Sequence, residues 1–221
     1  MDYRNVKVAM IVISDGKFTE LREMTQNCIN SAIVNSNEGN LEVIVFEKTQ
    51  FKYKNATTIH YEDAEFNYNK IANEGIKMYS KYDRFLICNN DLVFHNGWLK
   101  PLIACNMPVV SSVDPGLKKQ MAIRTNQLGY TNKVHFSPWC FMIDKKTWQQ
   151  IGGFDEDFGF WYADDSFLEQ LKKIETPPCI VINSKVTHLR SQTLSTVDEE
   201  EKSNLTVRQY EKFFNKYIKT S

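Results

Sequence analysis

Phe85-Leu86-Ile87-Cys88-Asn89-Asn90-Asp91 is the stretch that decides the fold of this 221-residue chain. Four consecutive apolar residues are typical of a short strand that is buried on both faces of a sheet. The two asparagines and the aspartate that follow end the apolar run and place amide and carboxylate groups at the end of that strand. In open α/β sheets, ligands bind beyond the carboxyl ends of the strands. Asp91 is therefore a candidate ligand-binding residue, and capping of the next turn is its alternative role.

The segments before this stretch predict alternating strands and helices. Residues 6–14 form a nearly continuous apolar run that Asp15 and Gly16 interrupt, and residues 41–46 form a second strand-like run. Between these runs, apolar residues recur at helical spacing over residues 21–32, and the same spacing returns over residues 68–79. The chain therefore opens as a β-α-β unit, which predicts parallel strands.

The segments after Asp91 continue the alternation. We expect strands at 109–113, 139–143 and 179–186, and helices at 98–105, 145–151, 164–174 and 207–217. Residues 114–137 are rich in Gly, Lys, Asn and Gln and predict a long loop of the kind that often closes over a site. The predicted class is α/β, with a mainly parallel, Rossmann-like central sheet flanked by helices.

Composition limits the classes of function. With 42% apolar and 13% aromatic residues, the chain has enough apolar material for one substantial domain. A formal net charge of zero gives no broad positive field for non-specific nucleic-acid binding. Five scattered cysteines without C-x-x-C spacing, and an N-terminus without a signal-peptide pattern, favour a cytoplasmic location. No apolar run approaches the length of a membrane-spanning helix, so we expect no integral membrane association.

Several motifs together resemble one family. The N-N-D sequence at 89–91 follows a central strand, and the polar segment and helix at 66–76 precede that strand. The segments at 139–145 and 152–158, the latter with a G-x-F-D-E-x-F pattern, precede an acidic motif at 163–165. In this order the motifs resemble those of the GT-A fold glycosyltransferases, especially the family 2-like branch. The resemblance covers roughly residues 6 to 195.

The resemblance implies a GT-A glycosyltransferase domain at 1–195, and we expect a C-terminal helical extension at 196–221 to pack on it. It also implies a metal site formed by Asp91 and His188, because late histidines bind the metal in metal-dependent members. A neutral imidazole beside carboxylate and phosphate oxygens suits Mn²⁺, while Mg²⁺ usually prefers an all-oxygen shell. A structural role is the alternative for His188.

The acidic motif implies the catalytic group. By residue-wise match, Asp165 is the expected general base, which takes a proton from the acceptor hydroxyl. The adjacent Asp164 stands where the family has glutamate, and it leaves the identity of the base open between the two carboxylates. The alternative is an acidic pair that only stabilises the N-terminus of a helix, an effect of about 0.3 to 1 kcal/mol.

Further side chains are candidates for substrate binding, although capping, core packing or loop bracing would explain each of them as well. The candidates for the nucleotide-sugar donor are Ser14, Asp15, Glu47, Asn69, Asn73, Asn89, Asn90 and Arg190. The candidates for the acceptor are Trp139, Asp155, Glu156, Trp161 and Tyr162.

The expected function is therefore metal-dependent transfer of a hexose from a nucleotide sugar, with UDP-sugar as the expected donor, to an acceptor hydroxyl with inversion. Mn²⁺ or Mg²⁺ is the expected cofactor. The acceptor class stays open between a glycan, a protein, a small molecule and a modified nucleic-acid base. One alternative is a nucleotidyltransferase, which would need a basic, glycine-rich phosphate-binding loop near the first strand; Ser14-Asp15-Gly16-Lys17 matches such a loop only weakly. The other alternative is a non-catalytic nucleotide- or carbohydrate-binding module.

Overall fold

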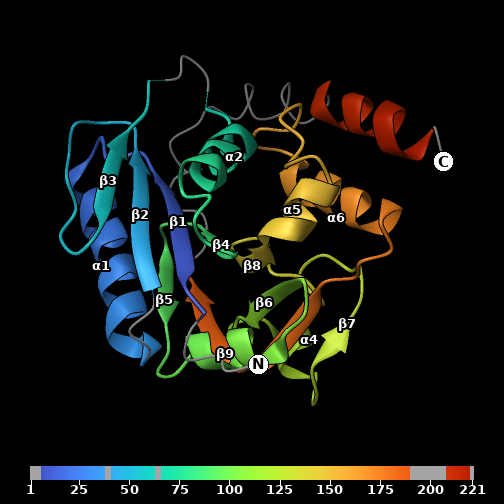
Figure 1. Ribbon diagram of the computed structural model, residues 1–221, viewed down its shortest axis with the longest axis horizontal. Helices are drawn as coiled ribbons and strands as arrows, with labels where there is room; N and C mark the ends of the chain where they lie inside the picture. Colours follow the sequence, from blue (N-terminus) through green and yellow to red (C-terminus); the bar gives the residue numbers. More distant parts are fainter. Residues whose placement is uncertain (1–5, 38–40, 63–65, 190–207, 220–221) are drawn as a thin grey trace.

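The computed structural model describes residues 6–37, 41–62, 66–189 and 208–219. A central sheet with helices on both faces forms the body of the molecule (Figure 1). Arg190 and the expected domain division after residue 195 lie outside the described residues, so both stay predictions.

One half of the sheet is parallel, as the opening β-α-β pattern predicts. The order of its strands is β3, β2, β1, β4, and each neighbouring pair runs in the same direction. The carboxyl ends of these strands therefore share one edge of the sheet. The strand bounds are β1 Val8–Ser14, β2 Leu41–Glu47, β3 Thr57–His60 and β4 Arg84–Cys88.

The other half of the sheet corrects the expectation of a mainly parallel arrangement. Strand β8 is antiparallel to both β4 and β6, β5 is antiparallel to β9, and β6 is parallel to β9. The segment between β6 and β8 contains only short elements and no long crossover helix, so the chain re-enters the sheet from the same edge in the opposite direction. The strand bounds are β5 Leu92–Phe94, β6 Val109–Val113, β7 Gln127–Leu128, β8 Cys140–Asp144 and β9 Cys179–His188.

This mixed order gathers several chain segments at one edge. Because β6 and β9 run in the same direction as β4, their carboxyl ends lie at the edge where β4 ends. The antiparallel β8 begins there. The turn after β4, the end of β9 and the excursion at 114–139 therefore meet at the edge where open α/β sheets bind ligands.

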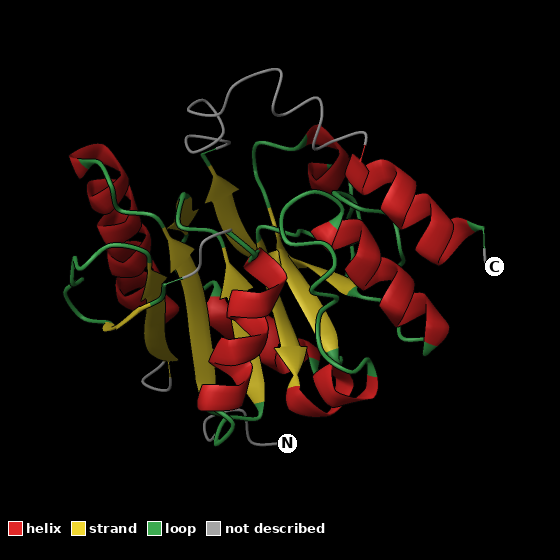
Figure 2. Cartoon of the chain, turned by 90° about the horizontal axis from the view of Figure 1, so that it is seen from above, coloured by secondary structure: helices red, strands yellow, loops and turns green. Residues whose placement is uncertain are grey.

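Helices cover both faces of the sheet (Figure 2). Their bounds are α1 Thr19–Ser36, α2 Tyr68–Met78, α3 Leu99–Cys105, α4 Lys118–Met121, α5 Lys145–Gln150, α6 Ala163–Lys173, and a terminal helix at 208–219 that includes a π-helical turn at Phe214–Ile218. None of the helices in the described ranges combines the length and the apolar composition of a membrane span.

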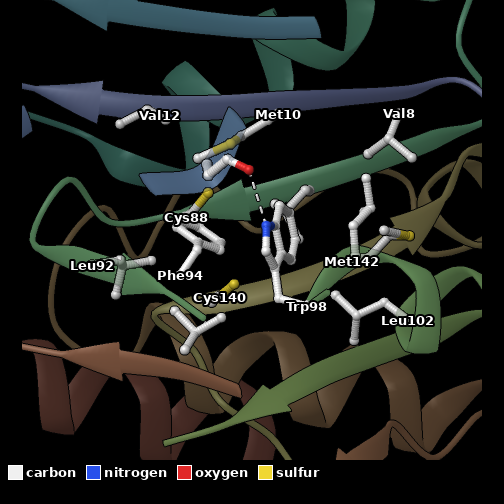
Figure 3. Close-up of a cluster of buried hydrophobic side chains, with 14 of the residues drawn as sticks. Val8, Met10, Val12, Cys88, Leu92, Phe94, Trp98, Leu102, Cys140 and Met142 are labelled. Atoms are coloured by element: carbon white, nitrogen blue, oxygen red, sulfur yellow. Dashed lines mark hydrogen bonds between the residues drawn. The ribbon is translucent and has the colours of Figure 1, made fainter. Parts of the chain in front are cut away.

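Alternation along the strands divides the core into two clusters. On β1, Val8, Met10 and Val12 belong to the cluster that contains α1 and Trp98, while the intervening residues face the cluster under α2 and α6. Figure 3 shows the first cluster around Trp98, whose indole N–H donates to the Ala32 carbonyl oxygen at 3.0 Å. Burial on both faces explains the nearly continuous apolar sequence of this strand.

The terminal helix packs on the loop that precedes α6. Phe213 and Tyr217 are buried against Phe158, and Lys216 forms ion pairs with both Asp155 and Asp157. Figure 1 shows this helix beside α6. The described part of the C-terminal segment is thus attached by an aromatic cluster and by charge pairs.

We expect Phe213→Ala to lower the local free energy of opening of the terminal helix by about 3 kcal/mol, because the substitution leaves a cavity against Phe158 and Tyr162. Amide hydrogen exchange over residues 208–219 measures this change. Ile218→Ala is the matched control, since Ile218 lies on the same helix and is 46% exposed. Equal exchange rates in the two variants would contradict the packing role of Phe213.

Candidate active site

Asp91 and His188 meet at the edge where β4 ends. The chain leaves β4 at Cys88, turns through Asn89 and Asn90, and enters β5, whose first residue Leu92 pairs with His188 of β9. This register places the Asp91 carboxylate beside the imidazole, with Oδ1 3.2 Å from Nε2 of His188. Strand pairing therefore joins two residues that lie far apart in the sequence.

The donor set of this pair fits a divalent metal ion. Oδ1 of Asp91 is buried and makes no hydrogen bond, because its contact with Nε2 of His188 is close in distance without hydrogen-bond geometry. Neighbouring ligands of an octahedral ion with bonds of about 2.1 Å lie about 3.0 Å apart. The observed 3.2 Å is close to that spacing. The described residues contain no cluster of three or more His, Cys, Asp or Glu side chains.

Two neighbours fix the orientation of the His188 ring. The indole of Trp139 stacks on it with centroids 5.1 Å apart and an interplanar angle of 16°. The Asn89 side-chain nitrogen lies 3.5 Å from Nε2 of His188.

Trp139 therefore lies beside the pair formed by Asp91 and His188. Its predicted role as a sugar-stacking residue of the acceptor site stays untested. The residue is 5% exposed, and one face of its ring is occupied by His188. Its indole N–H is buried without a hydrogen-bond partner. Asn90 is buried too, and its amide donates to Thr25 of α1 at 3.0 Å, which ties the turn after β4 to that helix.

The residues at the ends of β1 and β2 that were predicted to contact the nucleotide-sugar donor differ in whether the protein already hydrogen-bonds their side chains. Glu47 is fully buried, and its carboxylate accepts hydrogen bonds from Gly16, Thr49 and Tyr53. Ser14 is bonded to Thr25 and Tyr53 at 3.1 and 3.0 Å. Glu47 and Ser14 thus organise the strand ends.

Asp15 is the available carboxylate at this edge. It is half-buried and makes no hydrogen bond or ion pair with another described side chain. Of the two carboxylates among the predicted donor contacts at the ends of β1 and β2, that of Glu47 is hydrogen-bonded, and that of Asp15 makes no hydrogen bond within the described residues.

Four predicted contact residues instead hold one another. Asn69 donates to the Asp155 carbonyl oxygen at 2.9 Å, and Asn73 donates to the Phe154 carbonyl oxygen and the Glu156 carboxylate at 2.8 and 2.9 Å. The Asp155 carboxylate accepts from the Tyr217 hydroxyl at 2.6 Å. The structure thus uses these side chains to brace the 152–158 loop between α2 and the terminal helix, and the predicted substrate contacts stay untested.

Asp164 and Asp165 lie in the first turn of α6. Tyr162, the residue before the first residue of α6, has φ of 58°. This left-handed conformation is uncommon for an aromatic residue, and it turns the chain into the helix. Burial raises the pKa of Asp165 above its ordinary value, and the neighbouring Asp164 charge raises it further. A carboxylate that is destabilised in this way accepts a proton more readily, as a general base requires.

The aromatic candidates beside this acidic pair are partly engaged. Tyr162 stacks on Phe213 of the terminal helix, with centroids 5.1 Å apart and an angle of 20°. Trp161 packs edge-on against Phe160, and its buried indole N–H has no hydrogen-bond partner. The predicted roles of Trp161 and Tyr162 in acceptor binding stay untested.

Two further polar residues were not predicted from the sequence as site residues. Asn132 donates to both Asp164 and Asp165. Tyr68, at the start of α2, has a buried hydroxyl without a partner; burial raises its pKa most, and the Asp91 charge contributes in the same direction. Tyr68 lies in the segment at 66–76 and Asn132 in the loop at 114–137, but neither segment singles out these side chains, so the long-range fold is what reveals them.

No protein-family model and no curated protein sequence matches this chain. Among solved structures, it is similar to GalNAc-T7 crystallised with UDP, GalNAc and Mn²⁺, with a TM-score of 0.66 and 9% sequence identity. The similarity covers 83% of this chain and 44% of that chain, so this chain spans less than half of the length of GalNAc-T7. At this identity the likeness shows the fold, and the chain has the fold of that structure.

Proposed function

We propose that this chain is a metal-dependent glycosyltransferase that moves a hexose from a UDP-sugar to an acceptor hydroxyl with inversion. The observation that carries the proposal is the contact between Asp91 and His188 at the ligand-binding edge of a sheet with this fold. The UDP and Mn²⁺ in the GalNAc-T7 structure support a nucleotide-sugar donor and a metal for a chain with the same fold.

On this proposal, the Asp91 carboxylate and the His188 imidazole would hold the divalent ion, beside the place of the donor diphosphate. A divalent ion, when bound there, neutralises the charge that develops on the leaving diphosphate. Trp139 stacks on the His188 ring and keeps it in its orientation. Asp15 is the carboxylate that remains available for the nucleoside part of the donor.

The acidic pair on α6 supplies the base. Asp165 takes the proton of the acceptor hydroxyl while that oxygen forms a bond to the anomeric carbon. The bond from this carbon to the donor phosphate breaks at the same time, and the diphosphate leaves with the electron pair. Displacement from the opposite side in one step inverts the configuration of the sugar.

The nucleotidyltransferase alternative fits the structure less well. Such an enzyme needs backbone N–H groups after β1 that are free to bind phosphate. The Gly16 N–H instead donates to the buried Glu47 carboxylate at 2.8 Å, and the Tyr53 hydroxyl donates to the other oxygen of that carboxylate. An anionic ligand at this loop would have to approach a buried carboxylate.

The proposal is tested by incubating the protein with UDP-, GDP- and dTDP-hexoses in Mn²⁺ and a mixture of saccharide and polyol acceptors. We expect release of a nucleoside diphosphate from one donor, loss of this activity with a chelator, and recovery when Mn²⁺ is added back. Release of a hexose 1-phosphate would favour nucleotidyl transfer, because that group leaves when an acceptor attacks the nucleotidyl phosphorus of these donors. The absence of a nucleotide product from every donor would count against the transferase itself.

A further inference from the structure

A tight turn in the excursion between β6 and β8 lies against α6. Within it, the His135 N–H donates to the Thr131 carbonyl oxygen at 2.9 Å, and the Lys133 N–H donates to that of Phe136 at 2.8 Å. The turn is anchored by Phe136, which is fully buried and packs on Phe167 of α6 with centroids 5.5 Å apart. The position of this turn relative to α6 is therefore set by the hydrophobic core.

Asn132 projects from this turn to the acidic pair. Its side-chain nitrogen donates to Oδ2 of Asp164 at 2.7 Å and to Oδ1 of Asp165 at 3.1 Å. An amide nitrogen carries two hydrogens, so one reaches each carboxylate. The opposite amide orientation would place an oxygen against two negative groups, which fixes the nitrogen as the atom that faces them. The Asn132 oxygen is buried and makes no hydrogen bond.

This bridge opposes the three effects that favour a protonated Asp165. Burial and the Asp164 charge raise the pKa of Asp165, and Glu169 on the same helix raises it further. Asn132 and the nearby Lys133 lower it. Asn132 is therefore the residue that joins both carboxylates and also stabilises their charged forms.

We propose that Asn132 is a positioning residue for the base: it bridges Asp164 and Asp165, fixes their relative orientation and keeps Asp165 ionised for proton abstraction. The proposal rests on the proposed glycosyl transfer for its catalytic meaning. The bridge itself, in which Asn132 donates to two adjacent carboxylates, does not depend on the proposed activity.

The decisive variant is Asn132→Leu, which has a similar volume and cannot donate a hydrogen bond. We expect the acid limb of its pH–rate profile to move upward by about one pH unit, the scale of one lost charge-assisted hydrogen bond. The sign follows because a higher pKa keeps Asp165 protonated, and inactive as a base, to a higher pH. Activity should recover above the shifted limb, and the KM for the donor should not change.

Thr131→Ala is the matched control, because this exposed residue lies on the same turn and its side chain makes no hydrogen bond with a described residue. Asn132→Ala is the second variant if the leucine side chain prevents folding. A fall in rate by the same factor at every pH, with an unmoved acid limb, would show that Asn132 has only a structural role and would overturn the proposal.

A measurement without turnover separates this inference from the proposed function. Titration of carboxyl groups by ¹³C NMR, with Asp165→Asn used to assign the signal, should show a higher midpoint for Asp165 in Asn132→Leu than in the wild type. An unchanged midpoint would overturn the proposal for Asn132 even if the protein transfers a sugar. A raised midpoint in a protein without transferase activity would retain the bridge and reject the proposed function.

Discussion

Asp91→Ala is expected to weaken the affinity for UDP in the presence of Mn²⁺ by roughly 100-fold, or about 2.8 kcal/mol. The substitution removes the carboxylate whose buried Oδ1 lies 3.2 Å from Nε2 of His188 and makes no hydrogen bond. The ion that would link this pair to the diphosphate then loses one of its two protein ligands. Calorimetric titration with UDP, in Mn²⁺ and again with a chelator, measures the effect.

The wild type should bind UDP much more weakly in the chelator, and Asp91→Ala should have the same weak affinity in both conditions. Asp83→Ala is the matched control, because Asp83 is an exposed carboxylate at the opposite end of β4. If Asp91→Ala keeps the metal-dependent gain in affinity, Asp91 does not bind the ion.

Asp165→Asn is expected to lower the rate of transfer by roughly 10³-fold and to leave UDP affinity in Mn²⁺ unchanged, because the amide fills the same space and cannot accept the proton. Steady-state rates and UDP titrations of the same preparation test both halves of this expectation. The folded state should persist, since a neutral side chain relieves the repulsion from Asp164.

The sharpest control for this prediction is Asp164→Asn. Asp164 also accepts from Asn132 and lies in the first turn of α6. Both variants therefore lose one negative charge at the same place, and a difference between their rates reports which carboxylate is the base. We expect a smaller loss of rate in Asp164→Asn. The reverse order of the two effects would assign the base to Asp164.

Much of the fold was predictable because its strands and helices have strong local patterns. The parallel half of the sheet, and helices α1, α2 and α6, follow from apolar runs and helical spacing. The antiparallel half was not predictable, since the direction of β8 depends on how the chain returns from the excursion after β6. Strands β3, β5 and β7, with bounds Thr57–His60, Leu92–Phe94 and Gln127–Leu128, are too short to show a period.

The strand pattern of the sequence placed Asp91 at the binding edge, whereas His188 was joined to it only through the resemblance to a family. The pairing of β5 with β9 accounts for their contact, and their role as metal ligands stays a prediction. Asn132 could not be found in this way, because its role depends on the burial of Phe136 against α6 and not on its neighbours in sequence. Polar residues such as Asn73 and Asp155 resembled ligand contacts, since sequence does not show whether a polar side chain is bonded within the protein.

On the proposed function, Asp91 and His188 would hold the metal of a nucleotide-sugar site. The most direct test is a crystal structure of the protein grown with UDP and Mn²⁺, in which anomalous scattering locates the manganese. We predict one ion about 2.2 Å from the Asp91 carboxylate and the His188 nitrogen, in contact with both phosphates of UDP. An ion bound to Asp164 and Asp165, or UDP bound elsewhere with no ion at Asp91, would contradict the claim.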